Sequence, residues 1–231
     1  MITIRRSSER GVIASSAQKM MCTFAYEGYR DRLFKSFRSL KALNECVLTP
    51  NTTLPEATRQ NLEILIYVMS GTLEYKDHFG AYSTLPAGMW LYVGSGSGTT
   101  HSLRNPSPGM PCQYLKAWIK PLKRDYEPTY QQKWFGTPRL GRWITISALD
   151  ARDDCFPVRQ DASVHLVLLD GDQKLGYSFT RNRFGWLHIT RGSITVNSEK
   201  LGPGDALAIE DQSSINLYAH EPSEAILFDL S

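Results

Sequence analysis

The 231-residue sequence has only four cysteines and a formal net charge of just +3. Its cysteines, at positions 22, 46, 112 and 155, lie far apart and form no C-x-x-C pair. We therefore expect reduced, buried thiols. The basic residues are scattered rather than clustered, which argues against a groove that contacts nucleic acid directly.

Long apolar segments are also absent. No run approaches the roughly 18 apolar residues of a membrane span, and residues 1–24 lack the apolar stretch of a secretory signal. The cytoplasm is therefore the expected location, and no membrane partner is expected. No segment shows a 3.6-residue apolar periodicity over three turns, so the sequence gives no indication of long helices.

Short strand-like runs dominate the sequence. They are rich in Val, Ile, Leu, Tyr and Trp and are separated by Gly, Pro, Asn and Ser clusters, a spacing typical of a β-sandwich or β-barrel. The clearest runs are residues 62–69, 89–93, 114–119, 164–169, 185–190 and 225–230. Turns are expected at residues 77–80, 94–98 and 202–205.

A weak internal repeat divides the chain. "IYVMSGTLEY" followed by "LPAGMWLYV" in the first half resembles "LHITRGSITV" followed by "LGPGDALAI" in the second. A unit that appears twice indicates two β-domains of one type. We therefore predict an all-β chain with a first domain at residues 1–120, a polar, proline-bearing connector at 121–141 and a second domain at 142–231.

The paired "G-x-L/I" and "P-x-G-D" turns resemble those of cupins, which are jelly-roll β-barrels. More specifically, "CTFAYEGYRD", "LKALNECVLTPNTTLP", "LEILIYVMSGTLEYKDHFG" and "HSLRNPSP" resemble successive blocks of the pirin family. The likeness covers nearly the whole chain in order and is strongest over residues 22–132. It implies two tandem cupin domains, as in bacterial pirin-like bicupins.

The resemblance also implies where a metal site would lie. In pirins, two histidines one residue apart precede the apolar strand, and a second motif adds a histidine and a glutamate. These ligands hold an iron-like metal, and some members are quercetin 2,3-dioxygenases. In this sequence the corresponding positions are Ala57, Arg59, His101 and Leu103. Only the histidine remains, and non-haem oxygenases usually need three protein ligands.

A one-residue slip in strand register does not restore the ligands. It brings Glu56 and Thr58 to the inward face, which still leaves the site one ligand short. The second half does not compensate, because His165, His188 and His220 fall in separate strands. No cofactor is therefore expected, and Fe, Ni or another divalent metal is expected only if the chain has an atypical oxygenase site.

One hypothesis is that Arg59 replaces the metal as the positive charge in a pocket that also contains His101. A buried guanidinium needs a carboxylate, for which Glu63 is the candidate. Such a pocket favours a small anionic ligand. The alternative is that Arg59 lies in solvent and His101 is a structural histidine. The aromatic residues Trp90, Tyr92 and Trp118 are expected in the core.

Three functions therefore stay open. The missing ligands favour a bicupin without dioxygenase activity that offers a scaffold for a small molecule or a protein. A quercetinase-like oxygenase with an unusual metal shell is the second. A thiol-based sensor of oxidative stress is the third, with Cys22 as the candidate because exposure is plausible near the N-terminus.

Overall fold

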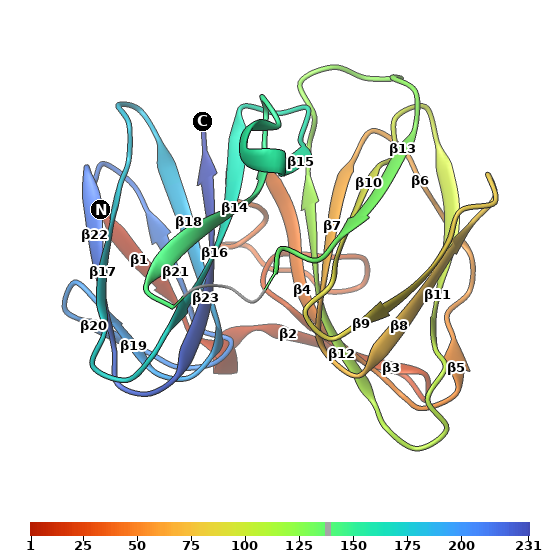
Figure 1. The fold of residues 1–231 in the computed structure, drawn as a ribbon, viewed down its shortest axis with the longest axis horizontal. Helices are drawn as coiled ribbons and strands as arrows, with labels where there is room; N and C mark the ends of the chain where they lie inside the picture. The colour runs from red at the N-terminus through yellow and green to blue at the C-terminus, as the bar shows by residue number, and fades with distance from the viewer. Residues whose placement is uncertain (137–139) are drawn as a thin grey trace. The chain divides into compact units, whose positions relative to one another are not determined.

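The computed structural model describes residues 1–136 and 140–231, and its regular structure is almost entirely β-strand (Figure 1). Two short 3-10 helices, η1 (Ser7–Glu9) and η2 (Arg152–Asp154), are the only helices in this described part. Neither is long or apolar enough to cross a membrane. The chain forms two compact units.

The first barrel comprises Gly11–Ser36 and Leu40–Trp134. Its strands are β2 (Gly11–Ala14), β3 (Gln18–Cys22), β4 (Leu40–Leu48), β5 (Thr52–Thr53), β6 (Ala57–Arg59), β7 (Glu63–Ser70), β8 (Thr72–Asp77), β9 (Tyr82–Pro86), β10 (Trp90–Gly94), β11 (Thr99–Asn105), β12 (Cys112–Ile119) and β13 (Thr129–Lys133). One sheet has the order β13-β10-β7-β12-β4-β3-β2. The other has the order β5-β11-β8-β9, with β6 also paired to β11.

The second barrel comprises Met1–Arg10, Phe37–Ser39 and Phe135–Ser231. Its strands are β1 (Ile2–Arg5), β14 (Arg142–Ala148), β15 (Phe156–Pro157), β16 (Ala162–Leu169), β17 (Lys174–Ser178), β18 (Phe184–Arg191), β19 (Ile194–Val196), β20 (Glu199–Leu201), β21 (Ala206–Ile209), β22 (Ser214–Ala219) and β23 (Ser223–Leu230). Its sheets have the orders β1-β21-β18-β23-β16-β14-β15 and β17-β22-β19-β20. Each barrel has its own apolar core.

The predicted all-β, two-cupin architecture is confirmed, and the repeat has a physical basis. Gly71 follows β7 and Gly192 follows β18, with φ of +78° and +77°. A Cβ atom would lie 2.8 Å from the Pro111 carbonyl oxygen at Gly71 and 2.5 Å from the Pro222 carbonyl oxygen at Gly192. Both turns therefore need glycine for its conformation and for its lack of a side chain.

The units differ from the sequence-based boundaries, and Phe37–Ser39 of the predicted first domain belongs to the second barrel. The first strand, β1, pairs with β21 and so belongs to the second barrel. Within the predicted connector, β13 pairs with β10 and completes a sheet of the first barrel. Both are edge strands that pair with residues distant in sequence, which a local pattern does not reveal. Residues 137–139 of the connector lie outside the described residues.

Candidate functional site

A cavity of about 130 Å³ in the first barrel contains all four positions that the pirin resemblance singles out. They are Ala57, Arg59, His101 and Leu103. The other lining residues are Gln18, Met20, Tyr26, Glu27, Leu54, Pro55, Lys116 and Trp118. The volume is small beside the roughly 300–1,000 Å³ of pockets for drug-sized ligands, so the cavity suits a small molecule or one end of a larger one.

Strand pairing brings these positions together. Strands β6 and β11 are antiparallel, with Ala57 opposite His101 and Arg59 opposite Thr99. Because side chains alternate along a strand, Ala57 and Arg59 share one face of β6. The slipped register does not occur, since Thr58 bonds the Thr100 hydroxyl (Oγ1–Oγ1 2.8 Å) on an exposed surface.

The donor set of this cavity does not fit a divalent metal. Alanine and leucine have no lone pair, and a guanidinium has donors only. His101 is a single imidazole ligand, and the one lining carboxylate, Glu27, faces Arg59 at 3.4 Å. Throughout the described part of the chain, no group of three or more His, Cys, Asp or Glu side chains is arranged to hold a metal ion.

Arg59 is held at the cavity by contacts with Glu27, Thr58 and Trp118 and by a side-chain hydrogen bond with Tyr26. Its Nη2 lies 3.4 Å from Glu27 Oε1, and its Nη1 donates to the Thr58 carbonyl oxygen at 3.0 Å. Its Cζ lies 4.9 Å from the ring centroid of Trp118, a cation–π geometry. The side chain is 25% exposed. Arg59 therefore places a permanent positive charge at the cavity, as hypothesised, although its carboxylate partner differs from the predicted one.

The predicted partner, Glu63, is in the core instead. It begins β7, is fully buried and is absent from the cavity lining. The hydroxyls of Tyr92 and Tyr126 donate to its carboxylate. The expectation that Glu63 pairs with Arg59 is therefore wrong. Glu63 and Arg59 would share one face only if a single unbroken strand joined them, whereas β6 ends at Arg59 and β7 begins at Glu63 in the other sheet.

Lys116 is a cavity residue that the sequence analysis missed. It lies on β12 and is half-buried, with its Nζ 5.7 Å from the ring centroid of Tyr26 and 5.5 Å from that of Trp118. Burial lowers the pKa of its amine, and the charge of Arg59 lowers it further. The available signal was a lone charge in the apolar run "YLKAWI", with the same parity as Trp118.

His101 is buried, at 8% exposure, and its ring stacks on Tyr75 with centroids 5.5 Å apart. Burial lowers its pKa to about 4, helped by the charges of Lys116 and Arg59 and opposed by Asp77. The imidazole is therefore neutral near pH 7. Within the described residues its Nδ1 has no hydrogen-bond partner, so its hydrogen-bonding capacity is not saturated by the fold.

Tyr26 and Glu27 complete the cavity from a tight turn. Tyr26 forms an isolated bridge with Tyr29, and Glu27 has a positive φ of +44°. The Tyr26 ring lies 5.0 Å from that of Trp118. Burial raises the pKa of the Tyr26 phenol well above its usual range, so it stays a protonated donor. Trp118, expected in the core, instead forms part of the cavity wall.

The other predicted residues lie in the interior. Trp90 and Tyr92 are buried, as expected, and Trp90 stacks on Tyr67 with centroids 4.6 Å apart. Cys22, the redox candidate, has 0% exposure. Its expected accessibility is therefore not found, because β3 places it inside the first barrel. All four cysteines are free and buried, as the sequence analysis predicted.

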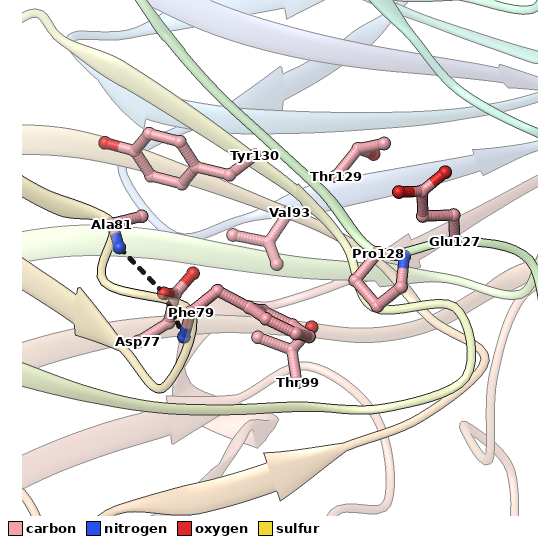
Figure 2. A pocket seen from close by; sticks show the side chains of 9 residues that line it. All are labelled: Asp77, Phe79, Ala81, Val93, Thr99, Glu127, Pro128, Thr129 and Tyr130. Carbon is pink, nitrogen blue, oxygen red and sulfur yellow. Dashed lines mark hydrogen bonds between the residues drawn. The ribbon is translucent and has the colours of Figure 1, made fainter.

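A second cavity in the first barrel, of about 310 Å³, lies against the β8–β9 hairpin (Figure 2). Asp77 is its most buried charged residue. Its Oδ1 accepts the backbone N–H groups of Phe79 at 3.0 Å and Ala81 at 2.9 Å, and its Oδ2 accepts the Tyr75 hydroxyl at 3.1 Å. This carboxylate therefore holds the hairpin and has little capacity left for a ligand.

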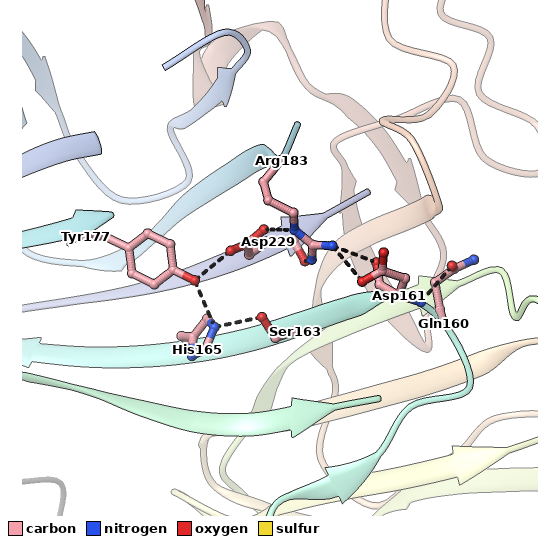
Figure 3. Close-up of polar contacts among 7 residues, drawn as sticks. All are labelled: Gln160, Asp161, Ser163, His165, Tyr177, Arg183 and Asp229. Atoms are coloured by element: carbon pink, nitrogen blue, oxygen red, sulfur yellow. Dashed lines mark hydrogen bonds and ion pairs between the residues drawn. The ribbon is translucent and has the colours of Figure 1, made fainter. Parts of the chain in front are cut away.

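The second barrel has a larger polar cavity, of about 480 Å³, and Figure 3 shows the polar contacts among several of its lining residues. Here Asp229 accepts the Tyr177 hydroxyl at 2.7 Å and Arg183 Nε at 2.6 Å. His165 Nε2 lies 2.8 Å from Ser163 Oγ and 3.1 Å from the Tyr177 hydroxyl. These polar groups therefore form hydrogen bonds with one another, whereas His101 Nδ1 and the Lys116 amine in the first barrel do not have such partners among the described residues.

None of the three histidines of the second half forms a ligand set. His165 belongs to the polar cluster of Figure 3, and burial lowers its pKa to about 4. His188 is fully buried on β18. His220 follows β22 and contacts the Thr195 hydroxyl at 2.7 Å. The three histidines therefore lie apart, on or next to different strands of the second barrel.

Two barrels, each built from two β-sheets, define a bicupin. Comparison with known proteins narrows the class: the pirin family model matches residues 6–119, and that of the quercetinase C-terminal cupin domain matches residues 145–230. The chain belongs to the pirin family, as a bacterial pirin-like bicupin.

Individual relatives extend over the whole chain. A protein of Escherichia coli strain K12 named quercetin 2,3-dioxygenase is 31% identical over 230 residues, covering 100% of this chain and 99% of the relative. The pirin-like protein of Caulobacter vibrioides is 28% identical over 208 residues, covering 89% of each chain. The crystal structure of Escherichia coli YhhW in complex with nickel(II) has a TM-score of 0.95 at 30% identity, covering 100% of this chain and 99% of that one.

Proposed function

We propose that this pirin-like bicupin binds a small carboxylate in the first-barrel cavity and has no metal-dependent dioxygenase activity. The proposal rests on the position of Arg59. In the family pattern a metal ligand occupies this position, and here the arginine lines the cavity together with Lys116. A guanidinium is always charged and matches the geometry of a carboxylate with two parallel donors.

The charges of the lining support an anion. Arg59 is the permanent lining cation, Lys116 is a second basic group whose pKa burial lowers, Glu27 is the lining carboxylate, and His101 is neutral near pH 7. Tyr26 and Trp118 form an aromatic wall that strengthens these contacts by excluding water.

The test is a titration of the full-length chain with acetate, lactate and inorganic phosphate by calorimetry and thermal shift, at constant ionic strength. In Arg59→Gln we expect small carboxylates to bind about 10- to 100-fold more weakly, the loss of a charge-assisted hydrogen bond worth roughly 1.5–3 kcal/mol. Lys76→Gln is the matched control, since Lys76 is exposed on the neighbouring strand β8 and does not line the cavity.

Two outcomes would refute the carboxylate site. One is that no small carboxylate stabilises the wild-type protein. The other is that Arg59→Gln and Lys76→Gln bind carboxylates equally well. Stabilisation by phosphate alone would mean that the site takes oxyanions of another class.

A metal-dependent oxygenase is the second candidate, favoured by relatives that bear the name quercetin 2,3-dioxygenase. It requires a donor set that the Ala57, Arg59, His101 and Leu103 quartet does not provide. The two functions are separated by measuring metal content and oxygen uptake with flavonols on one purified sample. Stoichiometric Fe, Ni, Cu, Zn or Mn together with flavonol-dependent oxygen uptake would replace the proposal with the oxygenase.

A further inference from the structure

Lys116 lines the cavity of the first barrel. Among the described residues, its amine has no ion-pair or hydrogen-bond partner and lies near the rings of Tyr26 and Trp118. A half-buried ammonium facing aromatic rings has lost part of its hydration without gaining a carboxylate. This desolvation lowers the pKa of the Lys116 amine.

Arg59 lines the same cavity, and its charge acts on this amine. Its guanidinium carbon is 4.9 Å from the Trp118 ring centroid, and Lys116 Nζ is 5.5 Å from the same centroid. A desolvated lysine next to a second cation is the arrangement that makes an amine nucleophilic at neutral pH. A lysine on a regular strand, as on β12, is also better positioned than one on a loop.

We propose that Lys116 forms a reversible imine with a small 2-oxo acid whose carboxylate is held by Arg59. The inference rests on the carboxylate site proposed above and names its ligand class. A 2-oxo acid has its carbonyl carbon bonded directly to the carboxylate carbon. One cation can therefore hold the carboxylate while the amine reaches the carbonyl within a cavity of about 130 Å³.

The step balances without an oxidant or a reductant. The amine lone pair attacks the carbonyl carbon, a C–N bond forms, and the carbonyl oxygen takes a proton to give a carbinolamine. The nitrogen then loses its remaining protons, the hydroxyl leaves with a proton as water, and a C=N bond forms. Two lining groups can hydrogen-bond to the reacting atoms while the protons exchange with water: the Tyr26 phenol, and the His101 imidazole through its unpartnered Nδ1.

The experiment is borohydride trapping on the full-length protein. Pyruvate and glyoxylate are each added with and without borohydride, followed by intact-mass measurement and peptide mapping. We expect one adduct per chain, located on Lys116, at pyruvate concentrations that leave exposed lysines unmodified. Lys116→Arg should remove the adduct, and the surface control Lys76→Arg should keep it. Arg59→Gln should reduce trapping at limiting pyruvate by at least about tenfold, in line with its weaker carboxylate binding.

Lactate separates this inference from the carboxylate site, because it carries the carboxylate but no carbonyl. If lactate binds and pyruvate is not trapped, the imine is refuted and the carboxylate site stands. If neither lactate nor pyruvate binds, both the carboxylate site and the imine are refuted. Trapping spread over several lysines, or unchanged in Lys116→Arg, also refutes the imine. Mapping the adduct on the wild-type chain keeps the test decisive even if Lys116→Arg does not fold.

Discussion

Arg59 lies beside Trp118, with its guanidinium carbon 4.9 Å from the ring centroid, and the two side chains come from different sheets of the first barrel. The indole fixes the position of the guanidinium while leaving donors for a ligand. Glu27, the paired carboxylate, is 56% exposed, so its ion pair with Arg59 contributes little to stability. An incoming carboxylate can therefore displace Glu27 at small cost.

The first prediction concerns this aromatic support. Trp118→Ala removes the cation–π contact, worth about 1 kcal/mol at a partly exposed site, and should weaken lactate binding roughly fivefold. Trp118→Phe keeps a ring face and should bind nearly as well as the wild type. Calorimetric titration measures both. Equal affinity in Trp118→Ala and the wild type would show that the ring does not position Arg59.

The second prediction restores a metal site. Since Ala57 lies opposite His101 and Leu103 follows on the same face of β11, the triple variant Ala57→His, Arg59→His, Leu103→Glu places four donors around one cavity. Such a set satisfies a transition metal. We expect about one equivalent of Ni²⁺ per chain after dialysis, measured by elemental analysis.

The matched control for this variant adds His101→Ala to the same three substitutions. It should hold much less Ni²⁺, because one of the four donors on the paired strands is lost. If the folded triple variant binds no more Ni²⁺ than the wild type, the cavity has a shape unsuited to the metal, and the missing ligands alone do not explain the difference from the family pattern.

Much of this fold follows from local sequence signals. Each of the six clearest strand-like runs overlaps an observed strand, and Gly71 and Gly192 occupy equivalent turns. The exceptions are edge strands: β1 completes the sheet of the second barrel and β13 that of the first. Their partners are distant in sequence, and a short polar edge strand has a weak pattern of its own.

The site was predictable only in part. The family pattern placed Ala57, Arg59, His101 and Leu103 together, and the structure brings them into one cavity. The partner of Arg59 was not predictable, because Glu27 comes from an irregular turn. Lys116 was overlooked because a charge inside an apolar strand is ordinarily read as solvated. The sequence does not show which face of β12 lines a cavity, because the cavity forms only where the two sheets pack together.

The third prediction follows from the buried position of Glu63. Glu63→Ala removes the acceptor of the Tyr92 and Tyr126 hydroxyls. It should lower the free energy of unfolding by about 3 kcal/mol, since hydrogen bonds to a buried charge are worth roughly 1.5–3 kcal/mol each. Lactate affinity should change less than twofold, because Glu63 does not line the cavity.

Urea unfolding measures the stability change, and the surface variant Glu74→Ala is its matched control. Glu74 pairs with Arg104 at 2.9 Å, but the arginine side chain is 42% exposed, so we expect a loss below about 1 kcal/mol. A loss of lactate binding in folded Glu63→Ala would mean that this carboxylate supports the site after all.

The fourth prediction is a dependence of stability on pH. Burial lowers the pKa of His101 and of His165 to about 4, from an ordinary value of 6.5. The unfolded chain therefore binds these protons more tightly than the folded protein does. The contribution of the neutral imidazoles to the free energy of unfolding is fully present above pH 6.5. It decreases as the pH falls from 6.5 towards 4 and is lost below that. Each histidine contributes a slope of up to about 1.4 kcal/mol per pH unit.

Urea unfolding at several pH values between 4 and 7 distinguishes the two histidines, because carboxylates titrate alike in all variants. His101→Gln and His165→Gln should each remove about half of the contribution that these two histidines make to the slope, and the double variant should remove all of that contribution. Since Lys116 and Arg59 both lower the pKa of His101, Arg59→Gln should shift the His101 part of the curve to higher pH and leave the His165 part unchanged. If stability depends on pH identically in the wild type and in His101→Gln, the imidazole is solvated in the folded protein. The cavity that His101 lines would then be solvated as well.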